Sequence, residues 1–548
     1  MKKEEKEEKE VVFLRKATGL VRTWGFLDVF SFNSYGNPML GYYTSFVILY
    51  AAFWATGHLI PAIIISTIAS ILQAFVYSSL VTTMPRAGGE YIWMTRIFRY
   101  PVIGFTLVLV GWVIVVMLWD ALLAPALAGL FLQPIALAFG NQALALWLMT
   151  KDGLFICSMI FVFVPWILIT LGMKWCGRFF SSSYVLGGLV AFIITAGILS
   201  MYNQTSFISA YNSFYSTNFG VTNAYQSALD TVSGWGVSFP GEWQWNWQAT
   251  LPLLALVAYA NSWSMWGAPM YGEVKGAKEM KVSFWSMAGS NLFNNALMII
   301  FLLAWIRLTG YQFFQSANFL YGDYVYAGVT TPAMQLWPSP TLYLYIMTGN
   351  VIPMLIVAIF GLYYIMIVHG VGCTYLPAIR ILFSMSFDRI LPAPLARLST
   401  KRKVPLVALA VLTVIAFIES YLYFYMPGFM TWTLIGTAVL ILSFIGTAVA
   451  GMLLPFVRRE EWKASAASKY RLGKIPFISI AAAITVGYFL YMYYWWATDP
   501  TFGVNNPVSV WFFVIVYAAV IILYFIMRAI RKRQGIDIGL VYKEIPVE

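Results

Sequence analysis

Apolar segments of about twenty residues recur along almost the whole chain, and this pattern constrains the fold more than any other feature. One helical crossing of a bilayer needs about 20 apolar residues. Of the 548 residues, 60% are hydrophobic and 10% are charged, whereas soluble domains are about a quarter charged. We therefore predict an all-α polytopic membrane protein with about twelve transmembrane helices. The expected segments are 22–55, 59–82, 101–131, 153–173, 179–201, 249–272, 283–307, 342–369, 404–425, 429–456, 476–497 and 507–528.

Lys and Arg are distributed unevenly over the loops between these segments. If the N-terminus is cytoplasmic, every basic cluster lies inside, while Lys151 and Arg307 remain outside and residues 202–250 contain no basic residue. Cytoplasmic loops are enriched in Lys and Arg, so we expect a multi-pass plasma-membrane protein with both termini in the cytoplasm. The formal net charge of +12 then reflects basic loops beside anionic lipid and not a nucleic-acid-binding surface.

Charged and polar stretches divide the chain. Residues 1–18 form a charged cytoplasmic tail that lacks the apolar region of a signal peptide, and residues 531–548 form a second tail. Between them we expect a ten-helix core at 19–456 and two further helices at 457–530. The core contains two repeats, about 19–201 and 249–456, joined by the external loop 202–248. This loop contains the glycosylation sequon Asn203–Thr205.

The scarcity of reactive side chains argues against an enzyme. Cys157, Cys176 and Cys373 are far apart and have neither a disulfide framework nor a metal-ligand spacing. Two histidines, His58 and His369, are too few for a haem–copper oxidase. No phosphate-binding loop or catalytic triad pattern is present. We expect no enzyme activity, no cofactor and no bound metal, with H⁺ or Na⁺ left open as a coupling ion.

Two of the predicted helices contain polar interruptions. The first is "SFNSYGNPMLG" at Ser31–Gly41, and the second lies in "AYANSWSMWGAPMYGEVK" at Ala258–Lys275. Unwound backbone at membrane depth survives only where it is buried or lines a cavity. Each interruption alone is consistent with a Pro or Gly kink. Their spacing of five helices instead predicts a five-plus-five inverted repeat with broken helices one and six, an arrangement that places a transport site at the breaks.

The ends of broken helices suit a zwitterion. An outer half-helix that begins near Pro38 presents free N–H groups to a carboxylate, and carbonyls near Ala260 suit an ammonium group. Tyr35, Tyr259 and the nearby tryptophans are candidate aromatic walls or ordinary packing residues. The candidate substrate-binding residues are Asn33, Ser34, Tyr35, Gly36, Asn37, Met39, Leu40, Gly41, Tyr259, Ala260, Asn261, Ser262, Trp263 and Trp266.

Three stretches resemble the amino acid–polyamine–organocation (APC) transporter superfamily. They are "MPRAGGEYIWMTR" at Met84–Arg96, similar to the Pro-x-x-Gly-Gly-x-Tyr loop, "GEVK" at Gly272–Lys275, and Tyr375–Leu409. The last stretch resembles the segment after helix eight, with Arg380, Asp388, Leu391-Pro392 and Pro405 matching. The resemblance covers about residues 14–456. It implies the five-plus-five fold, alternating access, and amino acids or related amines as substrates.

The chain also departs from that family. Only Gly41 matches the Gly-x-Gly of the helix-one break, which moves the carboxylate-facing amides to residues 37–41. Bulky residues near Trp263 replace a glycine that is usual in the helix-six break. The helix-five lysine of some proton-coupled relatives corresponds to about Gly187 here.

Several ionisable residues are candidates for coupling or gating. Asp28, Asp120 and Glu419 lie inside predicted spans, where a carboxylate is costly. Asp28 is a candidate gate partner for a cytoplasmic Arg, and Asp120 for protonation or contact with a substrate amine. Buried hydrogen bonding is the alternative, and Glu419 can also reach water near a helix end. Glu90 and Glu273 fall at cytoplasmic helix ends and resemble family motif positions, and Arg86 or Arg380 is the expected partner of either in a gating or structural ion pair. Asp388, which matches in the third family-like stretch, is a further candidate.

The leading hypothesis is a secondary transporter for amino acids or related amines. Its partners would be the small-molecule substrate and the bilayer, and the oligomeric state is not predicted. The alternative is a receptor or sensor built on a transporter fold, for which the large uncharged external segment gives some support.

Overall fold

The structure, a computed structural model, describes residues 19–34, 43–327, 331–332, 334–433 and 435–545. The regular structure of these residues is almost entirely α-helical, with short π-helical and 3₁₀ turns. Two-residue strands, β1 (Arg471–Leu472) and β2 (Ile475–Pro476), form a small antiparallel hairpin. This composition confirms the predicted all-α class.

Ten helical segments of the described chain are long and apolar enough to cross a membrane. Each overlaps one predicted span, so the multi-pass character of the protein is confirmed. The total of twelve helices and the inverted relation of the two halves stay predictions. The segments are α3 (Leu59–Thr83), α5 to α8 (Pro101–Ala138), α10 (Lys151–Thr170), α11 to α12 (Met173–Ser200), α16 to α17 (Met280–Thr309), α20 to α21 (Val351–Phe387), α22 (Leu406–Tyr425), α23 to α24 (Phe429–Val457), α26 (Phe477–Thr498) and α27 (Pro507–Arg533).

Short π-helical turns divide several of these segments, and π-helical turns often lie near functional sites. The elements within the segments are α5 (Pro101–Leu109), η3 (Val110–Val115), α6 (Trp119–Leu122), α7 (Ala124–Leu127), η4 (Ala128–Leu132) and α8 (Gln133–Ala138); α11 (Met173–Ser183), η5 (Tyr184–Val190) and α12 (Ala191–Ser200); α16 (Met280–Phe284), η7 (Trp285–Gly289) and α17 (Ser290–Thr309); α20 (Val351–Ile365), η8 (Met366–Tyr375) and α21 (Leu376–Phe387); α23 (Phe429–Trp432) and α24 (Gly436–Val457).

The two remaining predicted spans are the ones with polar interruptions. In the first, α1 (Phe26–Asn33) ends at Asn33, and helical structure is next described at η2 (Tyr43–Val47) and α2 (Ile48–Ala51). In the second, α15 (Trp247–Asn261) is followed by turns at 262–267 and then by the 3₁₀ helix η6 (Ala268–Glu273). We call residues 262–267 the helix-six break.

Helix eight begins later and ends later than the sequence suggested. The expected span was 342–369, but α19 (Pro340–Thr348) is a separate helix that ends at Gly349, whose φ is +59°. Asn350 then caps α20 by accepting a hydrogen bond from Ile352 N. A left-handed glycine followed by an Asn cap is a helix stop and start. At the other end, the helix continues through Arg380 to Phe387, so this part of the third family-like stretch is helical.

Helices at the end of the molecule that carries the predicted external loop begin at polar caps. Thr150, Asn203 and Asn246 accept hydrogen bonds from backbone N–H groups of the first turns of α10, α13 (Gln204–Phe219) and α15. Such caps satisfy N–H groups that have no partner inside the helix. The sequon residue Asn203 is thus also a helix cap.

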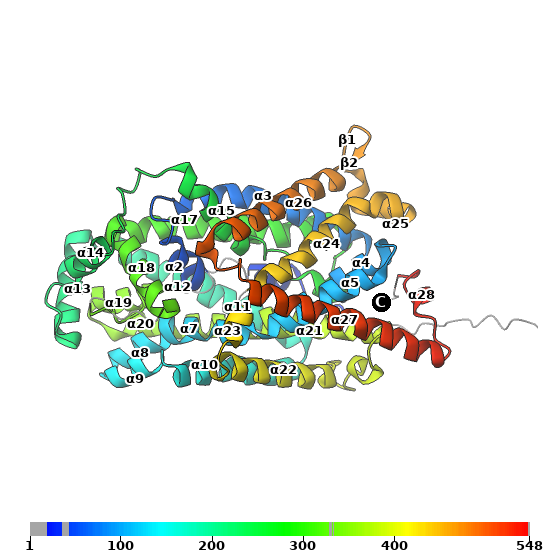
Figure 1. The fold of residues 1–548 in the computed structure, drawn as a ribbon, viewed down its shortest axis with the longest axis horizontal. Coiled ribbons are helices and arrows are strands. Elements are labelled where there is room, and N and C mark those ends of the chain that lie inside the picture. The colour runs from blue at the N-terminus through cyan, green and yellow to red at the C-terminus, as the bar shows by residue number, and fades with distance from the viewer. Residues whose placement is uncertain (1–18, 35–42, 328–330, 333, 434, 546–548) are drawn as a thin grey trace, which may run out of the picture.

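The two ends of the molecule carry different elements, as Figure 1 shows. One end carries α13, α14 (Ala224–Gly234), α9 (Gln142–Trp147) and α19, and here α13 packs on α17 and α19 while α14 packs on α18 (Tyr311–Ala327). The other end carries α25 (Arg459–Ala464), the β hairpin and α28 (Ile538–Val541). The predicted external loop and the predicted cytoplasmic C-terminal segment therefore lie at opposite ends.

Candidate functional site

The last residue of α1 is bonded directly to the helix-six break. Asn33 Oδ1 accepts a hydrogen bond from Gly267 N at 2.8 Å. Asn33 Nδ2 donates to Tyr271 OH at 3.1 Å and to Ser286 O at 3.0 Å. A Cβ on Gly267 would lie 2.6 Å from Asn33 Oδ1, so only glycine allows this approach. The two interruptions identified in the sequence therefore meet in space.

A cluster of buried aromatic side chains fills the space beside the break. Trp266 stacks on Trp112 with ring centroids 4.1 Å apart, and Trp119 lies 5.6 Å from Trp266. Trp263 contacts Trp119 and Tyr259 edge-on at 5.2 and 4.8 Å. These contacts join helix six to η3 and α6, and they place Tyr259, Trp263 and Trp266 together as the sequence suggested. The full cluster is Trp112, Trp119, Tyr259, Trp263, Trp266 and Phe444.

The two tryptophans of the break differ in their polar contacts. Trp266 Nε1 donates to Gly372 O and Cys373 O, both at 3.2 Å, and so ties the break to η8. Trp263 Nε1 is buried and has no acceptor among the residues that the structure describes. An orphaned indole N–H inside a protein is costly, because its hydrogen bond to water has been lost. It is a donor available to a ligand at the break.

Asn261 lies in a hydrogen-bond network that joins the end of α15 to α3 and α17. Its Nδ2 donates to Ser66 Oγ at 2.8 Å, and its Oδ1 accepts from Tyr43 OH and Asn295 Nδ2, both at 3.1 Å. Its carbonyl oxygen accepts from Asn291 Nδ2 at 3.1 Å. These bonds fix the end of α15 against α3 and α17. Three of the four polar contacts use the side chain, which gives Asn261 a structural role.

The other candidate residues near the breaks have local partners. Ser34 Oγ donates to Ser31 O at 2.6 Å and lies 3.4 Å from Tyr364 OH. Ser262 Oγ donates to Ala258 O, and its carbonyl accepts from Gln73 Nε2 at 3.4 Å. Ala260 is buried in α15. Tyr35, Gly36, Asn37, Met39, Leu40 and Gly41 lie outside the described residues, so the proposed carboxylate cradle is not part of the described site.

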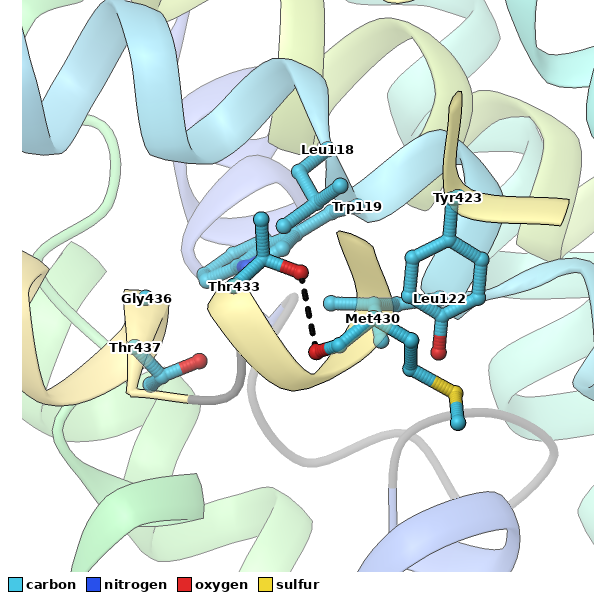
Figure 2. Close-up of a pocket in the computed structure, with 8 residues that line it drawn as sticks. All are labelled: Leu118, Trp119, Leu122, Tyr423, Met430, Thr433, Gly436 and Thr437. Carbon is cyan, nitrogen blue, oxygen red and sulfur yellow. Dashed lines mark hydrogen bonds between the residues drawn. The ribbon is translucent and has the colours of Figure 1, made fainter. Parts of the chain in front are cut away.

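A small pocket is lined in part by Trp119, whose ring also contacts Trp263 of the break. It contains about 330 Å³ of empty space, part of it open to solvent. Tyr259 OH donates to Thr437 Oγ1 at 2.9 Å, which connects the pocket wall to α15. Figure 2 shows that the lining residues come from the α6 region, α22, the α23 region and the start of α24. They are Leu118, Trp119, Leu122, Tyr423, Met430, Thr433, Gly436 and Thr437.

The chain before α1 is fastened to the end of helix six. Thr23 N and Trp24 N donate to Glu273 O at 3.0 and 3.1 Å, and Lys275 N donates to Trp24 O at 2.9 Å. The Glu273 carboxylate accepts from Arg380 Nε, and Arg380 Nη2 lies 3.3 Å from its second oxygen. Burial raises the pKa of Glu273, and the adjacent guanidinium opposes that rise. Helices one, six and eight are therefore joined at one point.

A second buried ion pair lies beside α4 (Gly89–Ile97). Arg96 Nη2 is 2.6 Å from Asp388 Oδ2, and both side chains are fully buried. Tyr91 OH donates to Asp388 at 2.9 Å. Tyr542, from the C-terminal segment, places its ring 5.3 Å from the Arg96 guanidinium. Asp388 therefore pairs with an arginine of α4, a partner that the sequence analysis did not name.

Glu90 is buried at the start of α4 and has neutral partners. Tyr77 OH donates to Oε1, and Trp112 Nε1 donates to Oε2 at 2.5 Å. Burial raises the pKa of Glu90 to about 7, and its hydrogen bonds oppose this rise. The expected partner Arg380 is bound to Glu273 instead, and Arg86 Nη1 donates to Pro85 O.

The carboxylates inside the predicted spans have neighbours on α11, η8 and α22. Asp28 accepts hydrogen bonds from Gly25 N at 2.8 Å and Ser181 Oγ at 2.6 Å, so it caps α1 and ties it to α11. Asp120 follows Trp119 on α6, but its neighbours are Thr374, Tyr375 and Glu419 from η8 and α22. Both Asp120 oxygens are buried and make no hydrogen bond with any described residue.

Sequence reasoning missed the aromatic partners of the break. Trp112, Trp119 and Phe444 read as ordinary apolar positions of helices three and ten, and only the packing shows that they meet Trp263 and Trp266. Within the described chain, no group of three or more His, Cys, Asp or Glu side chains is arranged to hold a metal ion.

No protein-family model matches this sequence, and no curated protein matches it either. The resemblance to the APC superfamily therefore rests on the three sequence stretches alone.

Proposed function

We propose that the protein is a secondary transporter that moves amino acids or related amines by alternating access. The observation that carries the proposal is the bond between Asn33 and Gly267, because it brings the ends of two interrupted helices together inside a multi-pass membrane protein. Paired broken helices are typical of transporter binding sites near the middle of the bilayer. Trp263 supplies an unused donor at this place and Tyr259 an aromatic wall.

The contacts around Glu273 support a closed gate in this proposal. Its ion pair with Arg380 and its backbone bonds to Thr23 and Trp24 join helices one, six and eight. Alternating access requires that such contacts break when the site opens to the side on which they lie. A transporter for uncharged small molecules would not need a site that binds both a carboxylate and an ammonium group. The experiment below therefore tests the substrate class directly.

The test is counterflow uptake by the purified protein in liposomes preloaded with an unlabelled amino acid. A panel of labelled amino acids and amines is offered, and at least one should enter saturably. Trp263→Ala should change the apparent affinity or the preferred substrate, because it removes the indole beside the break. Trp511→Leu is the matched control, since Trp511 is 66% exposed on α27.

A receptor or sensor remains the second candidate, and the aromatic cluster favours it. Tryptophans fill the space beside the break, and α13 and α14 form a folded layer over the predicted external end. Saturable binding without flux across the whole panel would support a sensor and contradict the transporter. Flux without a need for any gradient would support an exchanger.

A further inference from the structure

Three carboxylates are buried near the end of the molecule that carries α28, and one differs from the others. Glu273 pairs with Arg380, and Asp388 pairs with Arg96. Glu90 is fully buried too, but within the described part of the chain no guanidinium or ammonium group pairs with it. A buried carboxylate without a cationic partner tends to bind a proton, because burial disfavours its charged form.

The immediate surroundings of Glu90 are neutral and able to accommodate either protonation state. Tyr77 and Trp112 donate to its two oxygens, and Ser443 and Thr447 of α24 lie beside the carboxyl group. The helices α5 and α24 pack on α4, and α3 and η3 reach Glu90 through Tyr77 and Trp112. Of these four elements, α5, η3 and α24 carry no charged or titratable side chain, and α3 carries only Tyr77.

The titratable groups on the other elements that pack on α4 have partners of their own. Arg380 of α21 and Glu273 of η6 bind each other, and Tyr271 of η6 bonds to Asn33 and Ser286. Tyr91 and Arg96 of α4 form the second cluster with Asp388, at the end of α21, and Tyr542, which follows α28. Each of these charged groups thus has a partner other than Glu90.

Glu90 is mechanically connected to the helix-six break by two routes. Trp112, which donates to the carboxylate, stacks on Trp266 at 4.1 Å. Gly89, the residue before Glu90, lies so close to η6 that a Cβ would be 2.7 Å from the backbone of Ala268. Gly88 N also donates to Pro269 O at 3.0 Å. A change at Glu90 therefore reaches the break through the Trp112 ring, and it reaches η6, which directly follows the break, through the Gly88-Gly89 backbone.

We propose that Glu90 is the proton-binding residue that couples proton uptake and release to movement of the helix-six break. This inference rests on the proposed transport function and names its coupling ion. Because the pKa of Glu90 is raised to about 7, both protonation states are populated near neutral pH. The proton is taken from water on one side of the membrane and returned to water on the other.

The hydrogen bonds indicate how protonation would act. The carboxylate accepts from Trp112 Nε1, and Ser443 Oγ lies 3.0 Å from the same nitrogen. A protonated Glu90 is a weaker hydrogen-bond acceptor, so the Trp112 N–H would donate to Ser443 Oγ alone. The stacked pair of Trp112 and Trp266 would then no longer be held to the carboxyl group of Glu90. Ser443 can take this bond because its own proton is donated to Leu440 O at 2.8 Å.

Three measurements on the full chain test the proposal, each with Glu90→Gln and with Glu460→Gln as the control for an exposed glutamate. Infrared difference spectroscopy between acid and alkaline pH should show a carboxyl band that titrates near pH 7 and is absent in Glu90→Gln. The rate of amide hydrogen exchange in residues 262–275 should change more with pH in the unmodified protein than in Glu90→Gln. Neither measurement requires a known substrate.

The third measurement is uptake driven by a pH gradient at zero membrane potential. With one proton per substrate, a gradient of one pH unit should give about tenfold accumulation. Glu90→Gln should lose that accumulation and keep counterflow, because exchange of substrate does not require net proton movement. Glu460→Gln should behave as the unmodified protein.

The outcomes separate this proposal from the transport function. If the unmodified protein shows no counterflow uptake, the proposed transport function is contradicted. The infrared and hydrogen-exchange results then test proton binding by Glu90 independently of transport. Gradient-driven accumulation by Glu90→Gln, a titrating band that persists in that variant, or equal pH dependence of exchange in both proteins would each overturn the proposal. If Glu90→Gln fails to fold, Trp112→Phe removes the same hydrogen bond, and an unchanged carboxyl titration in it would contradict the proposed coupling route.

Discussion

At the scale of single residues, burial of Glu90 should make the stability of the protein depend on pH. Its pKa rises from 4.5 to about 7 on folding, so the folded protein binds the proton more tightly than the unfolded chain does. The contribution of Glu90 to the free energy of unfolding is fully present below pH 4.5 and is lost as pH rises through about 7. The total contribution is about 3 kcal/mol.

Denaturation in detergent at about pH 5 and about pH 8 measures this effect. Glu90→Gln should remove most of the difference between the two conditions, whereas Glu460→Gln, with a side chain 84% exposed, should retain it. A Glu90→Gln protein that is as sensitive to pH as the parent would show that other groups dominate.

The residues also show where the sequence was sufficient and where it was not. Asn33, Tyr259, Trp263 and Trp266 were identified because polar or aromatic residues interrupt apolar helices, and the structure brings them together. Trp112 could not be identified in this way, since an aromatic residue in an apolar helix has no local signal. Pairing of Glu273 with Arg380 and of Asp388 with Arg96 depends on helices far apart in sequence, so charge and position alone left the partners open.

At the scale of elements, the structure gives a physical reason for the Gly88-Gly89 pair of the Pro-x-x-Gly-Gly-x-Tyr-like loop. Gly88 has φ +85° and packs against Ser384 of α21, while Gly89 has φ +32° and packs against Ala268 of η6. A side chain at either position would push α4 away from helix six or helix eight. The motif therefore holds three segments in close backbone contact.

Gly89→Ala should destabilise the protein and alter the helix-six break. The added Cβ would lie 2.7 Å from the Ala268 carbonyl group, in a conformation that alanine rarely adopts. Positive φ and overpacking together cost about 2–4 kcal/mol. Gly197→Ala in α12 is the control, because no atom lies within 4 Å of its Cβ and alanine favours helix. Thermal unfolding of both variants measures the difference, and equal stability would exclude tight packing of α4 on η6.

Helix boundaries were predicted less well than helix existence. Hydrophobic length located the ten candidate spans, because the bilayer sets that length. It placed the start of helix eight too early, because the apolar residues of α19 continue the pattern across Gly349 and Asn350. The folded helices α13 and α14 were not predicted either, since their polar sequence carries no membrane signal and their order comes from packing on α17, α18 and α19.

At the scale of the whole molecule, the C-terminal segment closes the end that carries the buried ion pairs. Arg458 donates to the carbonyls of Tyr542 and Lys543 at 3.4 and 3.1 Å, and Arg96 Nε donates to Glu544 O at 3.3 Å. Within the segment, the side chains of Ile538, Val541 and Tyr542 are buried. The segment thus shields the pair of Arg96 with Asp388 from water and connects it to the end of α24.

Deletion of residues 538–548 should therefore weaken the protein at this end. Three buried side chains and four hydrogen bonds are lost. This is a gross loss of about 6–15 kcal/mol, which the entropy of the freed chain partly offsets. The exposed ion pair that remains is worth at most about 1 kcal/mol, because water screens it. Thermal unfolding compares the deletion with Lys532→Gln, a change at an exposed site that should be neutral. The loss should also become larger at high salt, because added salt screens the Arg96–Asp388 pair once solvent reaches it. An unchanged unfolding temperature would mean that α4 and α21 hold the ion pair without the C-terminal segment.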